Sequence, residues 1–304
     1  MRERQRYSYD ASPAICVGGR EQQEDAIAMD FAEGADFGFI VLADGMGGHS
    51  AGDVASKIVV TEVFSELKML ADQPELLERN FDRILRKAVA AANECVARIA
   101  QDSPGSRGMG ATLIAPVVFD NRLYWISVGD SPLYLLRGSR LFRLNEEHSF
   151  ASRMSKLVAK GQLDPEVAEQ HPDRNCLTSV LGGQAIPEID CRSQAVELRE
   201  NDIVIAASDG LQFIGEWQIA RIAFEARDLP SAEIGKRLLQ SVYDLDDPDQ
   251  DNVSLCVLKI SKREIETPFS EVANLASCVP LQKIESATHT GVQQPSGNRQ
   301  ALGQ

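Results

Sequence analysis

Four aspartates, far apart in the chain, each stand at one end of an apolar run of strand type. Three runs precede their aspartate: "FGFIVLA" comes before Asp44, "LYWISVG" before Asp130 and "DIVIAAS" before Asp209. The fourth run, "NVSLCVLKI", follows Asp251. A carboxylate at the mouth of a buried strand is costly unless a partner compensates its charge. Because no comparable set of Lys or Arg accompanies these aspartates, the pattern favours a fold whose strand ends meet around bound cations.

Length and charge limit the classes of protein to which the chain can belong. It has 304 residues, of which 43% are hydrophobic, enough for one large globular domain or two small ones. Its formal net charge of −14 repels phosphate backbones, so we expect neither nucleic acid nor an anionic membrane as a partner. An acidic protein that handles phosphate must do so locally, through metal ions and a few placed arginines.

The cysteines and the terminus predict a cytoplasmic protein. The 6 cysteines form no CxxC pair and have no zinc-type spacing with the histidines, as expected for free thiols in a reducing compartment. No apolar run approaches the roughly 20 residues that span a bilayer. The basic start "MRERQRYSYD" is not followed by a hydrophobic stretch of signal-peptide type.

The spacing of apolar residues predicts strands and helices in blocks. We expect strands near 14–19, 26–30, 37–43, 110–119, 121–129, 132–144 (a hairpin), 189–198, 202–208 and 252–260. Helices are expected from residue 51, near 75–100, in two pieces within 149–171, and near 216–226 and 231–243. Strands and helices that come in blocks, and not in strict βαβ alternation, favour antiparallel sheets over a parallel sheet. We therefore predict an α+β fold, with two antiparallel sheets in a central sandwich and helices on both outer faces.

The composition changes after Lys259. Residues 262–304 contain one aromatic, Phe269, and are rich in Ser, Gln, Thr, Asn and Gly. Such a segment buries too little apolar surface to order itself. We predict a folded domain over 10–260 and a disordered C-terminal tail over 261–304.

The two Asp-Gly pairs have an ordinary alternative interpretation as type I′ hairpin turns. The pair at Asp44 opens "GMGGHSAG", whose four glycines are more than a turn needs. Oxygen ligands without clustered His or Cys select Mg²⁺ or Mn²⁺, and two such ions can share a bridging water. Asp44 is the best candidate to bridge them, because Gly45 beside it exposes a backbone carbonyl as a further ligand.

The segment "GGREQQEDAIAMD" adds three charged candidates before a predicted strand. Glu24 and Asp25 can reach the same site as the aspartates. Arg20 can bind a phosphate in a bidentate manner where carboxylates alone would repel it. The alternative for this segment is a solvated charged loop.

Eight phrases, in order, resemble the metal-dependent protein phosphatases of the PPM (type 2C) family, bacterial type. They are "REQQED" at 20–25, "VLADGMGGHSAG" at 41–52, "GMGATL" at 108–113, "SVGDS" at 127–131, "EEHSF" at 146–150, "HPDRNCLTSVLGG" at 171–183, "AASDGL" at 206–211 and "DNVSLCVL" at 251–258. The resemblance implies hydrolysis of phosphoserine and phosphothreonine in proteins, by a water activated at a binuclear Mn²⁺ or Mg²⁺ centre and without a phosphoenzyme. It also implies phosphorylated protein substrates and a cognate Ser/Thr kinase as partners.

The same resemblance implies a metal role for six residues. Asp44 resembles the ligand that bridges both core ions, with Gly45 giving its carbonyl. Asp209 and Asp251 resemble ligands of the first ion, and Glu24 the residue that holds the second through water. Asp130 resembles a ligand of a third ion.

Two further residues and one segment complete the implied site. Arg20 resembles the phosphate-binding arginine, and Asp25 a group that orients water. Residues 149–180 would form a flap near the site. In some members of the family a histidine follows the Asp-Gly pair, whereas Met46 stands there in this chain, so the proton donor stays open between His49 and water.

The chain departs from the family pattern near the third ion and the flap. Pro132 follows "VGDS" where Arg is usual, Ser179 and Val180 replace Arg and Ala, and Glu147 replaces Asp before His-Ser. These departures bear on local contacts and leave the ligand set intact.

Two alternatives stay open from the sequence. One is a catalytically weak or dead phosphatase-like binding or sensing module, against which the intact ligand set argues. The other is a two-metal hydrolase of small phosphoesters or a nuclease, and the acidic charge argues against the nuclease.

Overall fold

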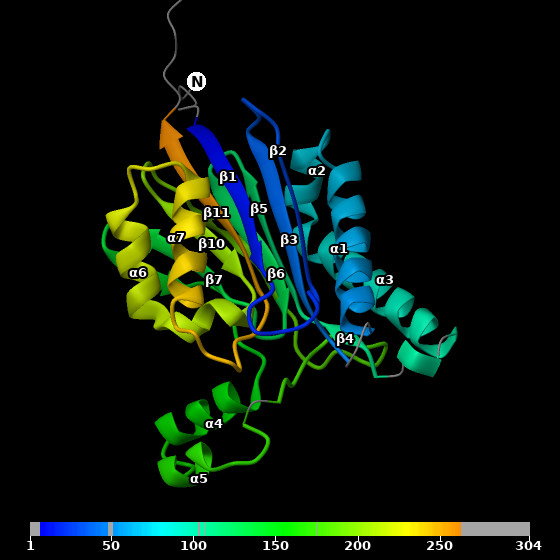
Figure 1. The fold of residues 1–304 in the computed structure, drawn as a ribbon. Helices are drawn as coiled ribbons and strands as arrows, with labels where there is room; N and C mark the ends of the chain where they lie inside the picture. The colour runs from blue at the N-terminus through cyan, green and yellow to red at the C-terminus, as the bar shows by residue number, and fades with distance from the viewer. Residues whose placement is uncertain (1–6, 48–50, 103, 107, 175, 263–304) are drawn as a thin grey trace, which may run out of the picture. The chain divides into compact units, whose positions relative to one another are not determined.

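The computed structural model describes residues 7–262 except 48–50, 103, 107 and 175, and its core is two antiparallel sheets packed face to face (Figure 1). The five-stranded sheet runs in the order β1 (Tyr7–Cys16), β11 (Val253–Lys262), β10 (Ile203–Ala207), β7 (Leu133–Arg137) and β8 (Arg140–Arg143). The six-stranded sheet runs in the order β2 (Asp25–Phe31), β3 (Phe37–Met46), β5 (Leu113–Phe119), β6 (Arg122–Val128) and β9 (Asp190–Glu197), with β4 (Gly110–Ala111) also paired to β3.

The central strands are apolar on both faces because each sheet packs against the other sheet on its inner face and against helices on its outer face. The inner faces share a core that includes Ile40, Trp125 and Leu258. The outer face of the six-stranded sheet packs under α1 (Ala51–Met69) and α3 (Phe81–Asp102). The outer face of the five-stranded sheet packs under α6 (Gly215–Glu225) and α7 (Ser231–Tyr243). The predicted sandwich with helices on both outer faces is confirmed.

The helix predicted near 75–100 is wrong in one respect, because it is two helices. α2 (Pro74–Arg79) ends at Asn80, whose φ of −125° and ψ of 21° are not helical and interrupt the helix before α3 begins. Short 3₁₀ turns, η1 (Pro104–Ser106) and η2 (Asp209–Ile214), complete the helical segments.

The flap segment forms two short helices that extend away from the sheets in Figure 1. α4 (Phe150–Ala159) is capped by Ser149, whose hydroxyl accepts a hydrogen bond from the Ser152 amide. α5 (Pro165–Glu169) is capped by Asp164 and has Pro165 in its first turn, and both residue types favour the start of a helix.

The described part of the chain begins and ends in two paired strands. β1 begins at Tyr7 and β11 runs to Lys262. The tail for which disorder is predicted lies, from residue 263 on, outside the described part of the chain. In that part, no helix combines the length and apolarity needed to cross a membrane. The described cysteines are free thiols, and Cys278 lies outside the described residues.

Candidate metal centre

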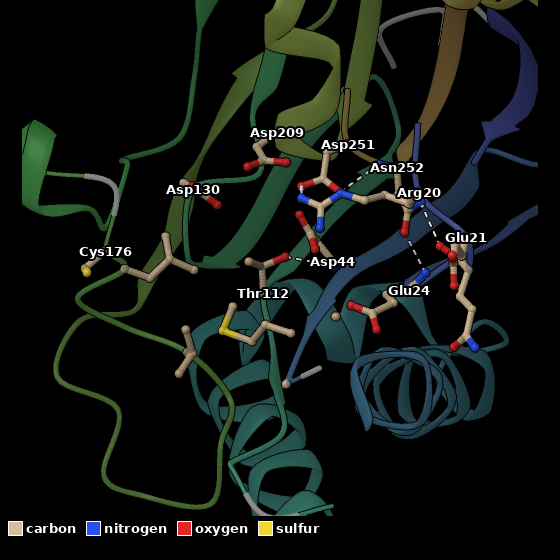
Figure 2. Close-up of a pocket in the computed structure, with 16 residues that line it drawn as sticks. Arg20, Glu21, Glu24, Asp44, Thr112, Asp130, Cys176, Asp209, Asp251 and Asn252 are labelled. Carbon is tan, nitrogen blue, oxygen red and sulfur yellow. Dashed lines mark hydrogen bonds and ion pairs between the residues drawn. The ribbon is translucent and has the colours of Figure 1, made fainter. Parts of the chain in front are cut away.

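The four aspartates at the strand ends meet around one pocket of about 820 Å³ (Figure 2). Asp44 lies near the end of β3, and Asp130 follows β6. Asp209 opens η2 directly after β10, and Asp251 precedes β11. Both sheets of the sandwich therefore contribute to the pocket, and the structure brings together carboxylates separated by up to about two hundred residues in sequence.

The Asp-Gly pairs are not hairpin turns. A type I′ turn needs a positive φ at both central residues, and none of Asp44, Gly45, Asp209 or Gly210, all four described in the structure, has one. Asp44 lies inside β3, opposite Asp25 of β2. The ordinary alternative interpretation of these pairs is therefore wrong.

Thr112, the residue between β4 and β5, holds the backbone of Asp44. The Asp44 amide donates to the Thr112 hydroxyl at 3.0 Å, and the Thr112 amide donates to the Asp44 carbonyl at 2.8 Å. The Thr112 hydroxyl also lies 2.8 Å from the hydroxyl of Ser131, the residue after Asp130. One buried threonine thus fixes the positions of two of the aspartates.

Gly45 is required by the close approach of three segments. A Cβ at this position would lie 2.1 Å from the Gly52 carbonyl oxygen in α1 and 2.5 Å from the Glu24 carbonyl oxygen. The Gly45 amide donates to that same Glu24 oxygen at 3.1 Å. Gly45 and Glu24 both line the pocket.

Arg20 lies at the pocket on the loop between β1 and β2. Its Nη2 donates to Oδ2 of Asp251 at 2.8 Å, and its side chain is 56% exposed. Figure 2 shows the guanidinium beside the Asp251 carboxylate and above Asp44. The loop therefore lines the pocket with Arg20, Glu21, Gln22 and Glu24, and Arg20 itself stays largely exposed.

Asn252 fastens this loop to the rest of the site. Its Nδ2 donates to the carbonyls of Val17 at 2.8 Å and Gln22 at 3.0 Å, and its Oδ1 accepts from the Glu24 amide at 2.7 Å. The side chain is buried, so these bonds do not compete with bulk water. Asn252 thereby sets the position of both Arg20 and Glu24.

Asp25 is the one predicted site residue that, among the described residues, does not line the pocket. It is 4% exposed, and its Oδ2 accepts a hydrogen bond from the Ser208 hydroxyl at 2.8 Å. Ser208 precedes Asp209 and also accepts from the Ser254 amide at 2.9 Å. Asp25 is thus buried beside the pocket, within the structure that supports it.

Burial and mutual repulsion raise the pKa values of the carboxyl groups. Burial, and then the charges of Asp25 and Asp209, raise the pKa of Asp44 well above its ordinary range. Burial, and then the charge of Asp209, raise the pKa of Asp130 to about 7. Burial, followed by the charge of Asp251, also raises the pKa of Asp209. At neutral pH the carboxylates repel one another unless a cation lies between them.

The residues fit a site for hard divalent cations. Oδ1 of Asp209 is buried and has no hydrogen-bond partner in the described structure, which is costly for a carboxylate oxygen. The acidic donors around the pocket offer oxygen atoms, which Mg²⁺ and Mn²⁺ prefer. In the described residues, no three His, Cys, Asp or Glu side chains form a ready-made ligand cluster. The carboxylates therefore line the walls of the pocket and would hold cations across it.

Thr112 and Asn252 do not stand out in the sequence as site residues. Both stand inside the phrases that carry the family resemblance, and Asn252 directly follows Asp251. Their contribution is to bond backbone groups of distant segments, which residue type alone does not reveal.

The departures from the family pattern have identifiable local contacts. The Pro132 carbonyl accepts from the Ala207 amide at 3.1 Å. The buried Ser179 hydroxyl accepts from the Glu188 amide at 2.9 Å, and Val180 lines the pocket. His49, one of the two candidate proton donors, lies outside the described residues.

Comparison with known proteins agrees with the geometry. The family model described as "Protein phosphatase 2C" matches residues 17–245. The chain is 29% identical over 252 residues to protein phosphatase PhpP of Streptococcus pneumoniae, covering 82% of this chain and 97% of the relative. The crystal structure of the serine/threonine phosphatase Stp1 from Staphylococcus aureus is similar at a TM-score of 0.69 and 29% identity, covering 83% of this chain and 95% of that chain. The catalytic domain of the serine threonine protein phosphatase PstP, solved in complex with 2 manganese ions, is similar at a TM-score of 0.63 and 29% identity, covering 84% and 100%.

Proposed function

Because this chain belongs to the protein phosphatase 2C family, we propose that it hydrolyses phosphoserine and phosphothreonine in proteins, with Mn²⁺ or Mg²⁺ as its cofactor. The observation that supports this most is the convergence of carboxylates from both sheets on one pocket that also holds Arg20. The similarity to bacterial phosphatases, one of them in complex with manganese, supports the same reaction and the same metal.

We assign metal-holding roles to residues that line the pocket. Asp44, with the Gly45 carbonyl, would bridge two ions. Asp209 and Asp251 would be further ligands of one ion, and Glu24 would hold the other. Asp130 would serve a third ion. Bound there, the metal ions would supply an activated water and neutralise charge on the phosphoryl oxygens.

The chain's own groups would bind and orient the phosphate. Arg20 reaches the pocket, and the contact described for it uses only Nη2, so the guanidinium can turn further donors toward a phosphate. The Ser208 hydroxyl fixes one oxygen of Asp25, and the other, Oδ1, has no partner in the described residues. Asp25 would therefore act as an acceptor that orients water at the base of the site.

A phosphate-release assay tests the proposal. Phosphoserine, phosphothreonine and phosphotyrosine peptides and a small aryl phosphate are incubated with Mn²⁺, with Mg²⁺ or with EDTA. We expect release from the first two peptides with metal and none with EDTA. Activity that survives EDTA would rule out the metal mechanism, and activity on the small ester alone would favour a small-phosphoester hydrolase.

The Asp209→Asn variant connects that activity to this pocket. It keeps the shape of the side chain and removes its charge, so we expect a loss of at least about 100-fold in phosphate release, the scale of removing one metal ligand or its support. Asp228→Asn is the matched control, since the Asp228 side chain is 83% exposed. Full activity of the Asp209 variant would contradict the ligand assignment.

We further propose that the protein acts in the cytoplasm, opposite a Ser/Thr kinase. The free thiols support a reducing compartment. The kinase follows from the reaction, because phosphoserine and phosphothreonine in proteins must first be made. Comparison of phosphoproteins in cells with and without the protein tests this, and an unchanged phosphoserine and phosphothreonine pattern would contradict it.

A further inference from the structure

The loop that carries Asp130 is held from behind by the segment that leads into α4. The Asn145 Nδ2 donates to the Ser131 carbonyl at 3.0 Å. The His148 amide donates to the Gly129 carbonyl at 2.9 Å, and the Gly129 amide donates to His148 Nδ1 at 3.1 Å. Both neighbours of Asp130 are therefore bonded to this segment, and the side chains of Asn145 and His148 are buried.

Arg143 holds Asp130 itself and joins it to Glu147. The Arg143 Nη2 donates to the Asp130 carbonyl at 2.6 Å, and Nη1 donates to Glu147 Oε2 at 2.7 Å. The Arg143 and Glu147 side chains are 18% and 29% exposed, so the pair is less screened by water than an ordinary surface ion pair. Charge-assisted bonds of this length are among the stronger ones in proteins.

Glu147 connects Arg143 to the flap, through Ser149. The Ser149 hydroxyl donates to Glu147 Oε1 and accepts from the Ser152 amide at 3.1 Å, which caps α4. Ser149 also forms an antiparallel bridge with Leu177, and the Thr178 amide donates to the His148 carbonyl at 2.8 Å.

The network thus begins and ends at the pocket. Asp130 and Leu177 both line it. Arg143 and Glu147, within the described part of the chain, are not among the lining residues. Any effect they have on the reaction must act through the residues that they hold.

We propose that Arg143 and Glu147 are positioning residues that couple the backbone of Asp130 to the flap wall at Leu177, so that two sides of the pocket keep a fixed spacing. The kinetic consequence rests on the proposed phosphatase function. A phosphopeptide is longer than its phosphoryl group and would extend to the flap wall, whereas a small aryl phosphate would not. The coupling should therefore matter more for the peptide.

The first test compares Arg143→Gln with Arg140→Gln in the full chain with Mn²⁺. Arg140 is a matched control because it lies on the same strand, exposed and stacked over Phe142. We expect Arg143→Gln to raise KM for a phosphothreonine peptide about tenfold, the scale of losing one charge-assisted hydrogen bond. For p-nitrophenyl phosphate the change should stay within about twofold, and Arg140→Gln should match the parent on both substrates.

The second test does not use activity. Hydrogen exchange of the full chain reports the amides of Gly129, Ser152 and Thr178, which the network holds. We expect Arg143→Gln and Glu147→Gln each to speed exchange at all three amides, and the double variant to exceed neither single variant, since both break one connection. Should Arg143→Gln fail to fold, Arg143→Lys keeps the charge but cannot bridge both acceptors, and it should show the same pattern.

The outcomes separate this proposal from the proposed function. Equal effects of Arg143→Gln and Arg140→Gln on the peptide KM, or additive exchange effects confined to the site of each substitution, would overturn the coupling. If the parent protein releases no phosphate from any peptide, the proposed function fails, while the exchange data still decide whether Arg143 and Glu147 couple Asp130 to the flap.

Discussion

Because the pocket carboxylates repel one another, removing one of their charges should stabilise the metal-free protein against unfolding, which can be measured without a substrate. Burial and the charge of Asp209 raise the pKa of Asp130 from its ordinary value of 3.8 to about 7. Asp130→Asn keeps the shape of the side chain and removes the charge. In EDTA at pH 8, we therefore expect the variant to be more stable than the parent.

The size and the pH dependence of the effect follow from the two pKa values. A carboxyl group with a raised pKa in the folded state binds more protons there than in the unfolded state, so the stability it contributes is lost as pH rises from 3.8 to about 7. About three pKa units at roughly 1.36 kcal/mol each give an upper limit of about 4 kcal/mol at pH 8, and less than half of that at pH 5. Because water reaches part of the pocket, a gain near 2 kcal/mol at pH 8 is the realistic expectation.

Urea unfolding in EDTA at several values between pH 5 and pH 8, followed by tryptophan fluorescence, measures the gain. Asp228→Asn, at an exposed site, is the control and should unfold like the parent. Added Mn²⁺ should shrink or reverse the advantage of Asp130→Asn, because the parent then gains a ligand that the variant lacks. A variant that is less stable than the parent at pH 8 in EDTA, or a difference that does not change with pH, would refute the reasoning.

Two substitutions and one titration test the groups that support the site. Asn252→Ala removes three hydrogen bonds to the Arg20 loop. We expect the free energy of unfolding to fall by about 2–3 kcal/mol and phosphate release to fall at least about tenfold. Unchanged activity would mean that the loop keeps its position without Asn252. Gly45→Ala places a Cβ 2.1 Å from a carbonyl oxygen of α1 and should destabilise by about 3 kcal/mol or more, whereas Gly105→Ala, which meets open space, should not. Burial lowers the pKa of His148, so its imidazole should titrate below about pH 6.5 by NMR, and the part of the stability that its neutral form contributes should be lost as pH falls through that range. Titration above pH 6.5 would contradict the lowered pKa.

The sandwich could be predicted because most of its strands are continuous apolar runs that can be recognised in the sequence. The exception is β1, whose first seven residues, "YSYDASP", look like a loop. It is an edge strand in which exposed and partly buried residues alternate over most of its length. Pro13 is tolerated there because an edge strand leaves one row of backbone groups unpaired. Alternation of this kind, with a proline inside it, does not distinguish an edge strand from an extended loop.

The candidate site could be predicted as far as its chemistry is carried by charge. Asp44, Asp130, Asp209 and Asp251 were recognisable because a buried strand that ends in a carboxylate requires compensation. Asn252 was not, since its amide bonds to backbone groups more than two hundred residues earlier in the chain. Which neutral polar residue makes such bonds depends on the packing of the two sheets, and one sequence does not fix that packing.

The most direct measurement of the central claim is anomalous X-ray diffraction from crystals soaked in Mn²⁺, recorded at the manganese absorption edge. The metal assignment predicts two strong peaks inside the pocket, with Asp44 between them and Asp209 and Asp251 beside one of them. A third, weaker peak is expected near Asp130. Crystals that bind Mn²⁺ elsewhere and show no anomalous peak among these carboxylates would contradict it.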